Sequence, residues 1–122
     1  MVLGAGPAGA AAAFFLSHLS DGKLSVLSLE KLDRNYGRYH HMCGEAISAK
    51  AFAELSPLEP EAVTFEIERA VEHWPGDVII DTETSGYILD RPAFLRKLLE
   101  RSVKEGCHLE KGAAVSISKE AV

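Results

Sequence analysis

Four residues near the start of the sequence have the types and spacing of a nucleotide-binding motif. Gly4, Gly6 and Gly9 form a G-x-G-x-x-G, and Glu30 ends a second apolar run. The glycines alone are a weak signal, because glycines recur by chance. Here an apolar run precedes them, a helix-like run follows, and the acid comes roughly 20 residues after the last glycine. Together these features predict a dinucleotide-binding βαβ unit.

Each of these positions has a physical task in such a unit. Gly4 allows the tight turn out of the strand, Gly6 lets the backbone approach a diphosphate, and Gly9 lets the helix lie close to the sheet. Pro7 suits the first helical turn, whose free N–H groups face the diphosphate. Glu30 accepts hydrogen bonds from ribose hydroxyls and repels a 2′-phosphate, so NADP is disfavoured. The alternative, an apolar helix and strand with incidental glycines, does not predict the acid.

The amino-acid composition is typical of an ordinary globular domain. The 122 residues suffice for one domain, with 47% hydrophobic and 25% charged residues. A net charge of −5 gives no basic footprint for nucleic acid and little attraction to an anionic membrane. Cys43 and Cys107 form no C-x-x-C, and no secretory signal is evident, which favours a reducing, cytoplasmic setting. The apolar residues 1–16 are too few for a spanning helix.

Hydrophobic spacing predicts alternating strands and helices, hence an α/β fold with a parallel sheet. Helices are expected over Pro7–Ser20, over residues 45–55, and from an Asp90 N-cap to about Lys104. The last of these would bury a stripe made of Phe94, Leu95, Leu98, Leu99 and Val103. Strands are expected at residues 1–3, 23–29, 63–68, 77–81, 86–89, 108–109 and 114–118. The first strand is short for its class, so the sheet is expected to be truncated.

Several segments together resemble a known family. They are Gly-Ala-Gly-Pro-Ala-Gly-Ala at residues 4–10, the pair Glu30 and Lys31, Cys-Gly-Glu-Ala-Ile-Ser at 43–48, and Gly-Tyr-Ile-Leu-Asp-Arg-Pro-Ala-Phe at 86–94. The chain resembles the amino-terminal part of geranylgeranyl reductases, FAD enzymes of the p-hydroxybenzoate-hydroxylase fold that saturate isoprenoid double bonds. The resemblance implies a Rossmann-like three-layer fold of the FAD/NAD(P)-binding type with a β-meander. It also implies that residues 1–122 are part of an FAD-binding domain, with the substrate domain absent.

The resemblance also implies which residues meet the cofactor. Ala8 and its neighbours would hold the diphosphate, Arg91 the phosphates or ribityl chain, and Val115 the adenine through its backbone. The full set is Gly4, Gly6, Pro7, Ala8, Gly9, Glu30, Lys31, Cys43, Gly44, Ala46, Arg91 and Val115. Cys43, Gly44 and Ala46 would line the flavin side. The sequence departs from the family pattern at residues 39–42 and at Ala46, which replaces a common glycine.

Two of these residues, Cys43 and Arg91, admit plainer interpretations, and a metal site is a further hypothesis. Cys43 is a candidate for a place near the flavin and the reacting atoms, or else a buried, inert thiol. Arg91 could contact FAD or merely form an ion pair with Asp90 at the helix start. His40, His41 and Cys43 could be imagined as metal ligands. Adjacent histidines point opposite ways and no fourth ligand has suitable spacing, so no metal is expected.

The function expected from the resemblance is FAD binding within an oxidoreductase that reduces isoprenoid C=C bonds. By itself the chain is expected to be inactive, because it lacks the family's second flavin motif and substrate domain. The alternatives are part of a flavin monooxygenase or halogenase, or a catalytically inert nucleotide-binding module. In the full-length family the expected partners are a prenyl lipid and a membrane surface contacted peripherally. For the isolated chain the expected partner is a second copy, in a homodimer that pairs exposed sheet edges.

Overall fold

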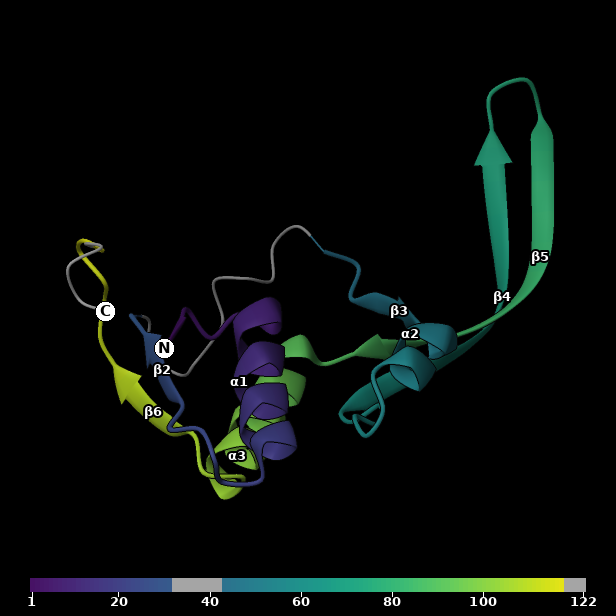
Figure 1. Cartoon of the computed structure of the whole chain (residues 1–122). Helices are drawn as coiled ribbons and strands as arrows, with labels where there is room; N and C mark the ends of the chain where they lie inside the picture. Colours follow the sequence, from purple (N-terminus) through teal and green to yellow (C-terminus); the bar gives the residue numbers. More distant parts are fainter. Residues whose placement is uncertain (32–42, 118–122) are drawn as a thin grey trace. The chain divides into compact units, whose positions relative to one another are not determined.

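The chain divides into two compact units (Figure 1). The structure is a computed structural model that describes residues 1–31 and 43–117. Unit 1 comprises Met1–Tyr39 and Leu95–Val122, and unit 2 comprises His40–Phe94.

A parallel sheet forms the centre of unit 1. Its strands are β1 (Val2–Leu3), β2 (Leu27–Glu30) and β6 (His108–Lys111), in the order β1-β2-β6. Val2 pairs with Ser28, and Leu27 pairs with His108. This arrangement confirms the α/β fold with a parallel sheet that the spacing predicts. Parallel strands need a crossover connection, which is usually helical, and both crossovers of this sheet include helices.

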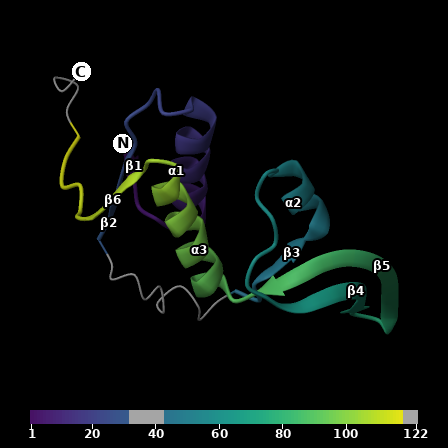
Figure 2. The same cartoon turned by 90° about the horizontal axis from the view of Figure 1, so that it is seen from below.

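Two helices, α1 (Pro7–Ser20) and α3 (Arg91–Lys104), pack side by side, as Figures 1 and 2 both show. The Arg101 guanidinium lies 5.1 Å from the Phe14 ring centroid, a cation–π contact. His18 Nδ1 lies 3.4 Å from Glu105 Oε1. Phe14 and Leu95 are among the largest fully buried side chains, so the core of unit 1 includes this helix pair.

Unit 2 is built on an antiparallel sheet. It contains β3 (Ala46–Ser48), α2 (Ala49–Glu54), β4 (Val63–Trp74) and β5 (Val78–Leu89), with strand order β3-β5-β4. Figure 2 shows β4 and β5 as a long two-stranded ribbon. The buried Phe52 ring contacts Tyr87 and Phe94, with centroid separations of 5.9 and 5.8 Å. Phe52, Leu58 and Leu89 are buried and form the small core of the unit.

Unit 2 also shows where sequence spacing misleads. The predicted helix at residues 45–55 begins only at Ala49, because Ala46–Ser48 pairs with β5 as a strand. Gly86 makes that pairing possible, since a Cβ there would lie 2.7 Å from the Ile47 carbonyl oxygen. The short strands predicted at residues 63–68, 77–81 and 86–89 are wrong in extent, because β4 and β5 are 12 residues each. The sheet order also differs from a meander, because β3 neighbours β5.

Smaller corrections concern the ends of elements in unit 1. The strand predicted at residues 23–29 begins at Leu27. Residues 114–117 form no strand, and residue 118 lies outside the described residues. Val103 is 47% exposed rather than buried, although Leu95, Leu98 and Leu99 are buried as predicted. The helix start is confirmed, because the Asp90 carboxylate accepts a hydrogen bond from Ala93 N at 3.0 Å.

Candidate nucleotide-binding site

An open pocket of about 480 Å³ lies at the carboxyl ends of β1 and β2. Its third side is the segment that follows β6. The pocket is lined by Leu3, Gly4, Leu29, Glu30, Lys31, Gly112, Ala113, Ala114, Val115, Ser116 and Ile117. Ligands of open α/β sheets bind outside the carboxyl ends of the strands. The lining of this pocket therefore includes four of the predicted cofactor residues: Gly4, Glu30, Lys31 and Val115.

The glycine loop leads from this pocket into α1. Gly4 has φ +88°, a left-handed conformation that glycine adopts without strain, and its N–H donates to the Leu29 carbonyl at 2.8 Å. Gly6 is the N-cap of α1, Pro7 stands in the first turn, and no side chain caps the helix. A Cβ at Gly6 would meet nothing within 4 Å. The helix start therefore keeps amide donors and open space for an anion.

Gly9 holds α1 against the strand that precedes it. A Cβ at Gly9 would lie 1.9 Å from the Gly4 carbonyl oxygen and 2.9 Å from its carbon. Both atoms are backbone, so they cannot rotate away as a side chain could. The third glycine of the motif is thus required by packing within unit 1.

Glu30 is buried at the end of β2, with 6% of its surface exposed. Its Oε2 accepts a hydrogen bond from the backbone N–H of Ala5 at 2.6 Å. This bond ties the glycine loop to the second strand and fixes the carboxylate beside the pocket. Sequence reasoning missed Ala5, because a backbone donor has no signature in residue type.

Four other predicted cofactor residues belong to unit 2, whereas the glycine loop belongs to unit 1: Arg91, Cys43, Gly44 and Ala46. Arg91 Nε lies 3.6 Å from Glu45 Oε1, and the side chains of the pair are 20% and 18% exposed. Glu45 has φ +58°, and its carbonyl accepts from Leu89 N at 3.1 Å. A left-handed non-glycine residue costs on the order of 1–3 kcal/mol and persists only where its surroundings hold it. The Glu45 contacts, which sequence reasoning missed, supply that support.

The two thiols have opposite environments. Cys43 is exposed, and its Sγ accepts a hydrogen bond from Glu45 N at 3.4 Å, so the interpretation of Cys43 as a buried thiol is wrong. Cys107 is the buried one, and burial raises its pKa. Within residues 1–31 and 43–117, no three His, Cys, Asp or Glu side chains are grouped to hold a metal ion. His40 and His41 lie outside the described residues.

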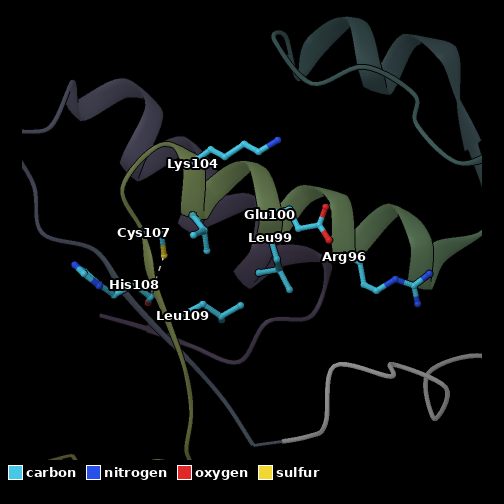
Figure 3. A pocket seen from close by; sticks show the side chains of 8 residues that line it. Arg96, Leu99, Glu100, Lys104, Cys107, His108 and Leu109 are labelled. Atoms are coloured by element: carbon cyan, nitrogen blue, oxygen red, sulfur yellow. Dashed lines mark hydrogen bonds between the residues drawn. The ribbon is translucent and has the colours of Figure 1, made fainter.

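A second open pocket, of about 570 Å³, lies between α3 and the start of β6 (Figure 3). Leu99 and Val103 contribute from the helix, and Cys107 and Leu109 from the strand side. Arg96, Glu100, Lys104 and His108 complete its lining. None of the predicted cofactor residues lines this pocket, whereas Gly4, Glu30, Lys31 and Val115 line the pocket beside the glycine loop.

Known proteins resemble this chain over most of its length. It is 34% identical over 112 residues to digeranylgeranylglycerophospholipid reductase 1 of Methanopyrus kandleri, and 30% identical over 116 residues to digeranylgeranylglycerophospholipid reductase of Methanosphaerula palustris. Each alignment covers 90% of this chain, which spans 28% of the length of either relative. No family model matches the sequence.

Two solved structures share the fold. A geranylgeranyl bacteriochlorophyll reductase-like protein from Thermoplasma acidophilum superposes with a TM-score of 0.82 at 24% identity, covering 98% of this chain and 31% of that protein. A flavin-dependent brominase gives a TM-score of 0.70 at 18% identity, over 96% of this chain and 30% of its own. At these identities the likeness concerns the fold. Among the described residues, no helix has the length and apolar character needed to cross a bilayer.

Proposed function

We propose that this chain is the FAD-binding portion of an oxidoreductase that reduces isoprenoid C=C bonds. Its sequence similarity to the digeranylgeranylglycerophospholipid reductases and its fold support this proposal. The observation that carries the proposal is the pocket beside the glycine loop. It gathers Gly4, Glu30, Lys31 and Val115 next to a helix start without a side-chain cap. A flavin, when bound, supplies the hydride chemistry, and the protein supplies binding and orientation.

The residues of unit 1 fit the adenosine diphosphate half of FAD. The first turn of α1 contains no acidic residue, so its amides and the helix dipole favour a diphosphate near Gly6, Pro7 and Ala8. The Glu30 carboxylate, already fixed by Ala5 N–H, is placed to accept ribose hydroxyls. The exposed backbone around Val115 offers polar groups to the adenine.

The residues of unit 2 are proposed to serve the flavin side. Arg91 carries a planar guanidinium suited to phosphate oxygens, and Glu45 holds it by charge. Cys43 is exposed and can approach a cofactor or substrate. The resemblance also predicts a prenyl-lipid substrate, a peripheral membrane contact of the full-length enzyme, and inactivity of the isolated chain. The cytoplasmic location stays a prediction from the cysteines.

FAD titration tests the proposal. Because a ligand that binds only the folded state stabilises it by about 2.7 kcal/mol at 100 times its Kd, saturating FAD is expected to raise the melting temperature. A yellow complex should also survive gel filtration. Unchanged melting temperature and absence of retained absorbance would refute FAD binding by this chain. Equal stabilisation by ADP without retained flavin would support the inert nucleotide-binding module instead.

We also propose that the chain forms a homodimer through unit 1. The parallel sheet has edges at β1 and β6, and Leu16, Leu19 and Val103 of the two helices are 44%, 74% and 47% exposed. Exposed edges and apolar faces favour association, and two-fold closure is its commonest form. Light scattering over a dilution series should give twice the chain mass of 13.2 kDa. The monomer mass at every concentration would rule the dimer out.

A further inference from the structure

Glu45 makes three contacts immediately before β3 in unit 2. Its carbonyl accepts a hydrogen bond from Leu89 N at 3.1 Å, which continues the pairing of β3 with β5 by one residue. Its Oε1 lies 3.6 Å from Arg91 Nε, and its N–H donates to Cys43 Sγ at 3.4 Å. Glu45 therefore contacts two of the residues that the family resemblance assigns to the cofactor.

The backbone of Glu45 has a conformation that suits glycine better than glutamate. Its φ of +58° lies in the left-handed region, where a Cβ is unfavourable. Such an outlier points to a functional constraint when the side chain has a specific contact. Of the three contacts above, those with Leu89 and Cys43 use backbone atoms that a glycine would also have. Only the contact with Arg91 needs the carboxylate, so this contact is the reason for a side chain here.

Arg91 gains from being held before a ligand arrives. It is the first residue of α3, and the Asp90 cap fixes its backbone through the bond to Ala93 N. Its side chain is long and has many rotamers, and ordering such a side chain on binding costs affinity. Glu45 contacts Nε, the guanidinium nitrogen nearest the aliphatic stem, and the two side chains are only 18% and 20% exposed. The contact therefore sets the direction of the planar group.

We propose that Glu45 is a positioning residue, whose carboxylate orients the Arg91 guanidinium for the cofactor before the cofactor binds. This role rests on the proposed function, which assigns Arg91 to the flavin side. Charge alone predicts the opposite effect, because a carboxylate beside the guanidinium reduces its attraction for phosphate oxygens. Removal of the carboxylate strengthens FAD binding if charge dominates, and weakens it if orientation dominates.

Glu45→Gly separates orientation from stability. The change relieves the left-handed strain and removes the carboxylate, so the melting temperature should stay within about 5 °C of the parent. FAD affinity should fall by about threefold to tenfold, because Arg91 must then be ordered on binding. ADP, which lacks the flavin and is held by unit 1, should bind within about twofold of the parent. Unchanged or tighter FAD binding overturns the proposal, as does a melting temperature lower by more than about 10 °C, which would mark a role in folding.

Two further variants show whether Glu45 acts through Arg91. Asp77, in the turn between β4 and β5, also has a left-handed φ, of +59°. Asp77→Gly makes the same backbone and charge changes there and should leave FAD affinity within about twofold of the parent. In an Arg91→Gln background, Glu45→Gly should cause no further loss of affinity. Equal losses in the two glycine variants, or a full additional loss in the Arg91→Gln background, would contradict the positioning role.

The N–H at Arg91 Nε tests the contact without any cofactor. Nε is buried, so its proton should exchange slowly with solvent in the parent and faster in Glu45→Gly, as followed by NMR of the isotopically labelled chain. Equal exchange rates in the two chains overturn the positioning role whether FAD binds or not. Accelerated exchange in Glu45→Gly, together with no FAD binding by the parent, would refute the flavin proposal while supporting Glu45 as the residue that holds Arg91.

Discussion

Replacing Gly9 with alanine is expected to destabilise the chain by about 3 kcal/mol or more. The added Cβ would lie 1.9 Å from the Gly4 carbonyl oxygen, and Val2 Cγ1 is only 3.5 Å away. Overpacking a tight contact typically costs about 1–3 kcal/mol, and here the neighbour is backbone, which puts the cost at the upper end. Thermal unfolding followed by circular dichroism should show a melting temperature lower by about 10 °C or more.

Gly6→Ala is the matched control for that experiment. A Cβ at Gly6 meets nothing within 4 Å, and φ there is −66°, which alanine tolerates. The stability of this variant should stay within about 1 kcal/mol of the parent. If Gly9→Ala melts at the same temperature as Gly6→Ala, α1 does not approach β1 as closely as the structure shows. If Gly6→Ala keeps its stability but loses FAD binding, the diphosphate of FAD occupies the open space beside Gly6.

Removing the Glu30 carboxylate is expected to give the largest loss of cofactor affinity. Hydrogen bonds to a charged group contribute about 1.5–3 kcal/mol, so Glu30→Gln should weaken FAD binding by about 10- to 100-fold. Glu30→Ala should also lower the free energy of unfolding by about 1–3 kcal/mol, because it leaves the fully buried Ala5 without the acceptor for its N–H. Flavin fluorescence titration and urea unfolding measure the two effects separately.

Glu110→Gln is the matched control for the Glu30 variants. Glu110 lies in the neighbouring strand β6 opposite Leu29, but its side chain is exposed. Its replacement removes the same charge and should change neither stability nor FAD affinity appreciably. An affinity in Glu30→Gln equal to that in Glu110→Gln would show that the Glu30 carboxylate does not hold the ribose.

Local patterns in the sequence were enough to predict most of unit 1 and the start of α3. The glycine spacing, the helix Pro7–Ser20, the Asp90 N-cap and the acid at position 30 each follow from residues close together in the chain, and the structure contains the elements they predict. Capping, turn chemistry and apolar periodicity act over a few residues, so a single sequence carries them. The family relation adds Val115, which the structure places in the pocket with Gly4 and Glu30.

Pairing between distant residues decided the rest. Ala46, Ile47 and Ala49 have helical spacing, yet residues 46–48 form a strand because Gly86, some forty positions later, admits their backbone to the sheet. The hydrogen bond from Ala5 N to Glu30 and the ion pair between Glu45 and Arg91 likewise join residues that only folding brings together. The sequence by itself determined which residues could bind a nucleotide. Only the tertiary structure decided their partners, because those partners are backbone groups and side chains far along the chain.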